Sequence, residues 1–258
     1  MSFFIDVQGT LLSDKDKSLI NGAKEILDFL NHKQIPYVVI TNNTKKPSDV
    51  FLDELRKKDL DIKNNGYLDP FCVLNEIISP CEVACFGADE FKNTMEKLGF
   101  VLDYENPKAV LIASGENFEF KEFAKMIEFV ENGAKFIAMH ATSIYKKNSF
   151  KYPGVGAICA MIQNATGKNF EIVGKPSDRF YKTALNLIKK QKNSLNFSEI
   201  SIISDDFRGD LLGAKKLGMK INLVLSGKID KISNDDAKIC DGVFRDIGDF
   251  LKDRLCKI

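Results

Sequence analysis

Short apolar runs alternate with stretches of helical periodicity along most of the chain. The runs with the length of buried strands are Phe3–Ile5, Tyr37–Thr41, Glu82–Phe86, Ala109–Ala113, Lys135–Met139, Ile200–Ser204 and Ile221–Leu225. Between the first and second runs, apolar residues recur at helical spacing, at Ile20, Ala23, Ile26, Leu27 and Leu30. Strands that alternate with helices in this way form βαβ units. The pattern therefore predicts an α/β fold with a mostly parallel sheet.

The middle of the chain repeats this alternation by itself. Its strand-like runs are followed by helical patterns through Met95 and Leu98, through Phe123, Ile127 and Val130, and over 156–164. A second helix is expected after Thr44, with Pro47 near its first turn, and a long one from about Asp178. We therefore expect a discontinuous core, made of residues 1–80 and 171–258, and a smaller α/β domain made of residues 81–170.

Composition and charge exclude several classes of protein. The 258 residues hold 37 Lys and Arg against 36 Asp and Glu, so the net charge of +1 gives no reason to expect nucleic acid or a membrane surface as partner. The six cysteines form no CxxC pair, and the start has neither a basic segment nor a long apolar one. No apolar run approaches the roughly 20 residues needed to cross a bilayer. We expect a reduced, cytoplasmic protein.

Polar segments with useful chemistry stand at the ends of predicted strands. They are Asp6-Val7-Gln8-Gly9-Thr10, Thr41-Asn42-Asn43, Gly174-Lys175-Pro176, and the segment 204–210, which contains Asp205, Asp206 and Asp210. Each has a plain interpretation when taken alone: a turn, a helix N-cap, a solvated lysine, or an acidic helix start. Open α/β folds, however, place their ligands at the carboxyl ends of strands. The joint occurrence of the four segments, in this order, favours one functional site.

Together the four segments resemble the motifs of the haloacid dehalogenase superfamily of phosphatases, and their residues are most similar to those of the NagD-like branch. Two further segments are similar to that branch, namely 152–157 (Tyr-Pro-Gly-Val-Gly-Ala) and 223–227 (Leu-Val-Leu-Ser-Gly). The resemblance covers nearly the whole chain. It implies a Rossmann-like parallel-sheet core with an α/β cap domain of the second type, inserted between the second and third motifs.

The resemblance also implies a role for each acidic residue. Asp6 is the expected nucleophile, because an ionised carboxylate can attack phosphorus and form an aspartyl-phosphate. The implied ligands of a Mg²⁺ ion are Asp6, the backbone carbonyl of Gln8, and Asp205, and oxygen ligands of this kind suit Mg²⁺. Asp210 is expected to orient Lys175 or a metal-bound water.

Other residues are expected to bind the substrate. Thr41, Asn42 and Asn43 would offer hydroxyl, amide and backbone donors to the phosphoryl oxygens, and the catalytic Lys175 would bring a positive charge to both the nucleophile and the phosphate. His140 follows the run Lys135–Met139, where NagD-like proteins usually carry an Asn-Pro-Asp loop that faces the substrate. It could contact the substrate, supply a proton in place of a missing acid, or be a plain loop histidine.

Gln8 is the one departure that affects the chemistry. In the family an aspartate at this place protonates the leaving group and later deprotonates the water that hydrolyses the acyl-phosphate. A positioned acid or base contributes about 10²–10⁴-fold to the rate, and an amide has no proton to exchange. The sequence therefore predicts slow turnover.

These observations predict a Mg²⁺-dependent phosphatase that acts on a small phosphorylated metabolite through an aspartyl-phosphate, with turnover weakened by Gln8. One alternative is a non-catalytic protein that binds or senses a phosphorylated metabolite. Another is a dehalogenase, since such members of the superfamily use the same nucleophile without the second aspartate; Asp205, Asp210 and the cap argue against it. The sequence identifies neither the substrate nor the oligomeric state.

Overall fold

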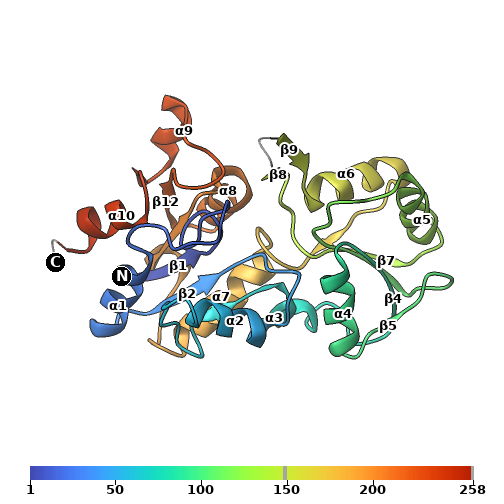
Figure 1. The fold of residues 1–258 in the computed structure, drawn as a ribbon, viewed down its shortest axis with the longest axis horizontal. Coiled ribbons are helices and arrows are strands. Elements are labelled where there is room, and N and C mark those ends of the chain that lie inside the picture. Colours follow the sequence, from blue (N-terminus) through green and yellow to red (C-terminus); the bar gives the residue numbers. More distant parts are fainter. Residues whose placement is uncertain (148–149, 257–258) are drawn as a thin grey trace. The chain divides into compact units, whose positions relative to one another are not determined.

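The computed structural model describes residues 1–147 and 150–256. These divide into two compact units, each with a parallel sheet of its own (Figure 1). The first unit consists of Met1–Thr41, Phe51–Leu68 and Tyr181–Ile258, and the second of Asn42–Val50 and Asp69–Phe180. Each unit is described by itself.

The sheet of the first unit places the ends of distant strands side by side. Its strands are β1 (Ser2–Asp6), β2 (Tyr37–Ile40), β3 (Tyr67–Leu68), β11 (Ile200–Ser204), β12 (Lys220–Val224) and β13 (Gly242–Phe244). They run in parallel in the order β13-β12-β11-β1-β2-β3. The order along the chain therefore reverses between β1 and β11, where Phe4 lies opposite Ile202. Such a reversal is the place where open α/β sheets bind ligands.

Helices cover both faces of this first sheet. Phe3 and Ile5 of β1 belong to a buried cluster with α1 (Ala23–His32) and α10 (Ile247–Arg254). Phe4 points to the opposite face, as alternation along a strand requires, and its ring stacks on Tyr181 of α7 (Asp178–Lys189) at 6.4 Å. The other elements between or after these strands are α2 (Ser48–Arg56), η1 (Phe197–Glu199), η2 (Phe207–Leu211), α8 (Leu212–Lys216) and α9 (Asn234–Ile239).

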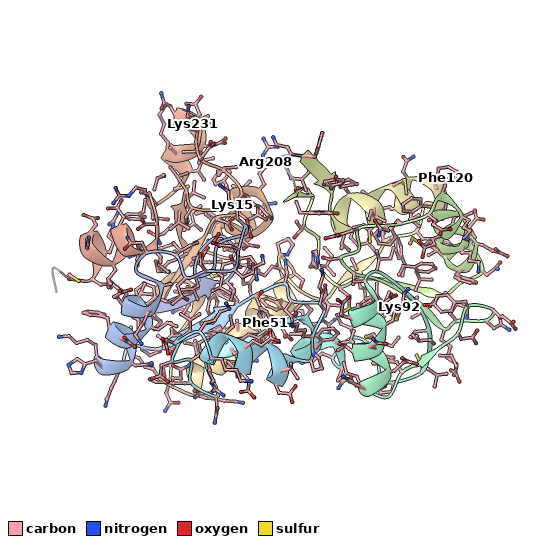
Figure 2. All side chains as sticks on the ribbon, viewed as in Figure 1. Lys15, Phe51, Lys92, Phe120, Arg208 and Lys231 are labelled. Carbon is pink, nitrogen blue, oxygen red and sulfur yellow. The ribbon has the colours of Figure 1, made fainter. Side chains whose placement is uncertain are left out.

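The second unit is a smaller α/β structure. Its parallel sheet has the order β10-β7-β6-β4-β5, formed by β4 (Glu82–Phe86), β5 (Val101–Leu102), β6 (Ala109–Ile112), β7 (Lys135–Ala138) and β10 (Glu171–Ile172). Helices α5 (Phe120–Glu131) and α6 (Val155–Thr166) pack on one face of it. The unit also holds α3 (Pro70–Leu74), α4 (Asp89–Lys97) and an antiparallel ladder of β8 (Ile144–Lys147) and β9 (Phe150–Pro153). Phe120, at the start of α5, is almost fully exposed (Figure 2).

The α/β class, the parallel core and the second, smaller α/β element predicted from the pattern are confirmed. Every apolar run chosen as a strand forms one, with ends that differ by at most one residue from the predicted ones. Strand β10 pairs with β7 in the second sheet, although the expected boundary at residue 171 assigned this segment to the core. The boundaries of a cap at 81 and 170 stay a prediction.

Within the part of the chain that the structure describes, no helix is both long and apolar enough to cross a membrane. All six cysteines lie in this part, and each is a free thiol.

Candidate functional site

The first unit brings three predicted site segments to one edge of its sheet. Asp6 is the last residue of β1, Thr41 follows β2 directly, and Asp205 follows β11 directly. The strands are parallel neighbours, so their carboxyl ends meet at the same edge. Asp6 and Asp205 stand on the two sides of the point where the strand order reverses. All three side chains are buried, with exposed fractions of 5% or less.

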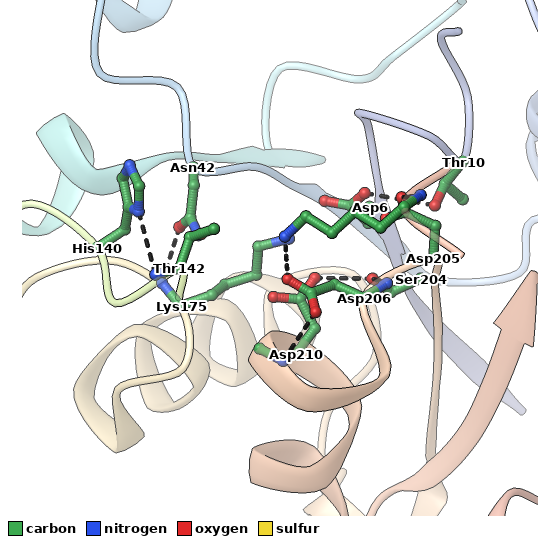
Figure 3. Close-up of polar contacts among 12 residues, drawn as sticks. Asp6, Thr10, Asn42, His140, Thr142, Lys175, Ser204, Asp205, Asp206 and Asp210 are labelled. Atoms are coloured by element: carbon green, nitrogen blue, oxygen red, sulfur yellow. Dashed lines mark hydrogen bonds and ion pairs between the residues drawn. The ribbon is translucent and has the colours of Figure 1, made fainter. Parts of the chain in front are cut away.

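The residues that follow Asp6 form a tight turn behind its carboxylate. The hydroxyl of Thr10 donates to Oδ2 of Asp6 at 3.3 Å (Figure 3). The backbone N–H groups of Leu11 and Leu12 both donate to the carbonyl of Val7 at 2.9 Å, which closes the turn behind the carboxylate. Gly9 allows this turn because its φ is +76°, a value that a residue with a side chain rarely adopts. The sequence Asp-x-x-Gly-Thr thus holds the carboxylate in place.

The Asp205 carboxylate is enclosed by two glycine-containing loops. A Cβ added at Gly9 or at Gly227 would overlap this carboxylate, so only glycine fits at either position. The backbone N–H of Lys228 donates to Oδ2 of Asp205 at 2.7 Å. Burial, and next the charge of Asp6, raise the pKa of Asp205 well above its ordinary range. Two buried carboxylates repel each other when both are ionised, and a cation bound between them would offset this repulsion.

We predict that Gly9→Ala disrupts this arrangement. The new methyl group would require both a strained backbone and a displaced Asp205 carboxylate. Thermal unfolding should show a lower Tm than that of the wild type. Gly218→Ala is the matched control, because Gly218 also has a positive φ, of +89°, but a Cβ there has no neighbour within 4 Å. Equal decreases in Tm in the two variants would mean that the clash with Asp205 adds nothing to the destabilisation by backbone strain.

A hydrogen-bonded network connects the other two acidic residues of the fourth segment. The hydroxyl of Ser204 donates to Oδ2 of Asp210 at 2.7 Å and accepts the N–H of Asp206 at 3.1 Å (Figure 3). Oδ1 of Asp206 accepts the N–H of Gly209 at 2.8 Å and so caps η2. Oδ2 of Asp206 forms an ion pair with the Lys228 ammonium. Asp206 and Asp210 therefore hold the loop that presents Asp205.

The side chain of Gln8 makes a contact that was not predicted. Its Oε1 accepts a hydrogen bond from Nζ of Lys17 at 2.8 Å. Lys17 lies in the connection between β1 and α1, is half exposed, and its Nζ is 4.0 Å from Oδ1 of Asp14. The side chain of Gln8 thus has a cation beside it, and any carboxylate placed there would meet the same cation.

Asn42 and Lys175 lie next to each other in the second unit. The backbone N–H of Lys175 donates to Oδ1 of Asn42 at 2.9 Å (Figure 3). A Cβ at Gly174 would come close to this same amide oxygen, which explains the glycine before Lys175. The Lys175 side chain is 2% exposed, so the solvated-lysine interpretation is wrong for it. The second and third motifs are thus connected directly.

Asn43 is engaged in its own loop. Its amide nitrogen donates to the carbonyl of Lys46 at 2.7 Å and to Oδ2 of Asp69 at 3.0 Å. Asp69 also accepts the hydroxyl of Ser48 at 2.7 Å. Through these contacts the Asn43 side chain stabilises the segment before α2.

His140 is buried at the end of β7, with a defined pattern of ring contacts. Its Nδ1 accepts the backbone N–H of Thr142 at 3.3 Å, so Nδ1 carries no proton (Figure 3). The proton of the neutral ring is then on Nε2, which lies 2.9 Å from the hydroxyl oxygen of Ser114 and donates to it. His140 is thus a buried partner of Ser114, which follows β6.

The structure adds residues that sequence reasoning missed. Lys228 contacts both Asp205 and Asp206, Lys17 contacts Gln8, and Ser114 contacts His140. Only Lys228 had a signal in the sequence, since it follows directly the segment 223–227 that resembles the NagD-like branch. Nothing in the sequence relates Lys17 to Gln8.

The donor set of the first unit fits a hard divalent cation. Asp6, Asp205 and the backbone carbonyl of Gln8 supply oxygen atoms only. Among residues 1–147 and 150–256, no cluster of three or more His, Cys, Asp or Glu side chains has the arrangement of a metal site. A cation that keeps several waters and needs one or two carboxylates is compatible with this set, whereas one that requires an all-protein cage is not.

Two family models match separate parts of the chain. The model of haloacid dehalogenase-like hydrolases matches residues 3–101, and a second model of HAD-hydrolase-like proteins matches residues 172–250. The two matched ranges contain every segment on which the sequence resemblance depended, except the one at 152–157.

Individual proteins are similar over almost the full length. An acid sugar phosphatase of Staphylococcus haemolyticus is 28% identical over 231 residues, which cover 87% of this chain and 85% of that protein. The crystal structure of a 4-nitrophenylphosphatase from Thermotoga maritima has a TM-score of 0.77 at 23% identity and covers 97% and 96% of the two chains. NagD from Escherichia coli K-12 has a TM-score of 0.74 at 24% identity and covers 96% of each chain.

Proposed function

We propose that this chain, which matches the models of haloacid dehalogenase-like hydrolases and has the fold of NagD, is a Mg²⁺-dependent phosphatase. It acts on a small phosphorylated metabolite through an aspartyl-phosphate on Asp6. The observation that carries the proposal is the pair of buried carboxylates, Asp6 and Asp205, on the two sides of the strand reversal. The name of the staphylococcal relative makes sugar phosphates the first substrates to test.

The residues of the first unit divide the chemistry between them. Oδ1 or Oδ2 of Asp6 attacks phosphorus, the bond from phosphorus to the leaving oxygen breaks, and an aspartyl-phosphate forms. Asp6, Asp205 and the carbonyl of Gln8 would hold Mg²⁺, which when bound offsets the charge of the attacking carboxylate and of the phosphoryl oxygens. Asp210, fixed by Ser204, keeps the loop after β11 in place. Water then hydrolyses the aspartyl-phosphate.

Gln8 makes the second step slow. It lies two residues after the nucleophile, and its amide can hydrogen-bond the leaving oxygen or a water but cannot transfer a proton. Its contact with Lys17 fixes the amide and does not supply a base, because an ammonium has no lone pair. We therefore expect the aspartyl-phosphate to form faster than it is hydrolysed.

Phosphate recognition is assigned to the second and third motifs. The Thr41 hydroxyl and the donors of Asn42 and Asn43 would bind phosphoryl oxygens, and the Lys175 ammonium would supply a positive charge. For Asn43 this task falls to the backbone N–H, because the side-chain amide is engaged with Lys46 and Asp69. His140 and the cap around residues 81–170 would contact the rest of the substrate. His140 as placed donates to Ser114, so we assign it no acid role.

We predict that Asp205→Asn stabilises the metal-free protein and removes its response to Mg²⁺. The folded-state pKa of Asp205 is raised, so this buried carboxyl destabilises the fold above its unfolded pKa, and the cost decreases as the pH falls from the folded pKa to the unfolded one. The variant should have a Tm about 2–4 °C higher near neutral pH. Mg²⁺ should raise the Tm of the wild type but not that of the variant.

Asp241→Asn is the matched control for this measurement. Partial burial acts to raise the pKa of Asp241, but the Ile221 N–H and the Lys215 ammonium lower it overall, so its charge stabilises the fold above the unfolded pKa. This variant should have a lower Tm near neutral pH and a normal response to Mg²⁺. An Asp205→Asn variant that is less stable and still responds to Mg²⁺ would contradict the assigned metal ligand.

The experiment that tests the proposed function is a substrate panel on the wild type with Mg²⁺ and with a chelator. Sugar phosphates and p-nitrophenyl phosphate should release phosphate only in the presence of Mg²⁺. Binding of phosphate esters with no release above the control would support the non-catalytic alternative. Halide release from a 2-haloacid, without phosphate release from any ester, would support a dehalogenase.

A further inference from the structure

The loop that follows β12 contacts the site at three points. The hydroxyl of Ser226 donates to the carbonyl of Gly9 at 2.7 Å. Gly227 packs against the Asp205 carboxylate so closely that no side chain fits there. The next residue, Lys228, binds Asp205 through its backbone N–H and Asp206 through its ammonium. The loop thus connects the turn after Asp6 with the loop after β11.

The backbone contact of Lys228 decides which way the Asp205 carboxylate faces. The N–H donates to Oδ2 at 2.7 Å, a distance that fits a strong hydrogen bond to a charged acceptor. A carboxylate held at one oxygen by a fixed donor presents its other oxygen, Oδ1, in a fixed direction. A metal ligand held in this way does not have to be ordered when the cation arrives.

The side-chain contact of Lys228 holds that backbone donor in place. The ammonium and the Asp206 carboxylate are both largely buried, with exposed fractions of 26% and 15%. Asp206 is itself fixed by the Gly209 N–H and by its own N–H bond to Ser204. The ion pair therefore joins residue 228 to a rigid loop.

We propose that Lys228 is a positioning residue for the metal site, because its ion pair with Asp206 holds the backbone N–H that aims Asp205 at the cation. The proposal rests on the proposed function in one respect, namely that Asp205 is a metal ligand. Lys228 itself touches neither substrate nor metal in this role.

Simple electrostatics predicts the opposite effect of removing Lys228. A buried ammonium close to a cation site repels the cation, so its loss alone would strengthen Mg²⁺ binding. Loss of a contact that orients a metal ligand instead weakens binding, by about 10–100-fold for such supporting residues. The sign of the change in affinity therefore separates the two roles.

The test is the dissociation constant of Mg²⁺, measured by calorimetry on the metal-free full chain without substrate. Lys228→Met should weaken binding by about 10–100-fold, and Lys228→Arg, which keeps the cation, should bind nearly as the wild type does. Lys215→Met is the control, since it removes another ion pair of the first unit, with Asp241 at 3.0 Å, and should leave the affinity unchanged. Circular dichroism establishes that each variant is folded.

Asp206→Asn gives a second measurement, which also serves if Lys228→Met does not fold. The proposal expects Asp206→Asn to weaken binding by a similar factor, and the double variant Asp206→Asn/Lys228→Met to be no worse than either single one. Tighter or unchanged binding in Lys228→Met, or additive losses in the double variant, would overturn the proposal. A wild type that binds no Mg²⁺ would overturn the metal site of the proposed function as well, which distinguishes the two failures.

Discussion

Gln8→Asp should accelerate the slow, phosphate-releasing phase of the reaction by about 10²–10⁴-fold, the usual contribution of a positioned acid or base. The new carboxylate would protonate the leaving group and then deprotonate the attacking water. Mg²⁺ affinity should change little, because the proposed metal site uses the backbone carbonyl of residue 8, which the substitution keeps. Stopped assays of phosphate release, after a burst with an activated phosphodonor, measure this phase directly.

Two further variants show whether the gain comes from proton transfer. Gln8→Asn has nearly the size of aspartate but no transferable proton, so it should stay slow. Lys17 lies 2.8 Å from the present side-chain oxygen, and its ammonium would lower the pKa of the new carboxylate. Gln8→Asp/Lys17→Met should therefore be the better acid toward poor leaving groups. If Gln8→Asn is accelerated as much as Gln8→Asp, proton transfer is not the missing function.

Asp6→Asn should lower phosphate release by roughly 10⁴-fold or more and abolish the burst as well, because the amide cannot attack phosphorus. The fold should persist, since the side chain keeps its shape and its contact with Thr10. Asp14→Asn is the control, as Asp14 is an exposed carboxylate in the same N-terminal segment and lies 4.0 Å from Nζ of Lys17. A burst that survives in Asp6→Asn would identify another nucleophile.

The fold was predictable where strands are long and buried. A strand of the parallel sheet that is covered on both faces is apolar at every position, as Phe3, Phe4 and Ile5 are, and such a run is recognisable without its neighbours. Strands β3, β5 and β10 contain two residues each and form only by pairing with a neighbouring strand. No periodicity can be read from two residues, so β3 and β5 were not predicted, and β10 was indicated only by the polar segment that follows it.

The site was predictable only in part, for a related reason. Asp6 and Asp205 follow apolar runs directly, and the topology of parallel sheets brings such positions to one edge. The partners of these residues come from loops that are distant in sequence: Lys228 reaches Asp205 from the loop after β12. Contacts between loops have no repeating pattern, so the sequence alone does not indicate them.

His140 shows how hydrogen bonds restrict a role that sequence leaves open. Surrogate acid, substrate contact and plain loop residue were all compatible with its place after an apolar run. Its Nδ1 accepts from Thr142, and the proton on Nε2 goes to Ser114. In this arrangement the Nε2 proton of the ring already has an acceptor, the Ser114 hydroxyl, and this contact gives the histidine a structural role.

The time course of the phosphorylated enzyme tests most directly whether an aspartyl-phosphate forms on Asp6 and is hydrolysed slowly. Wild-type protein is mixed with Mg²⁺ and an activated phosphodonor, quenched rapidly, and analysed by intact mass with localisation of the phosphoryl group. One phosphoryl group should accumulate on Asp6 during the burst, persist through the slow phase, and disappear much sooner in Gln8→Asp. Fast steady phosphate release by the wild type with no phosphorylated enzyme, or a phosphoryl group on any residue other than Asp6, would contradict this prediction.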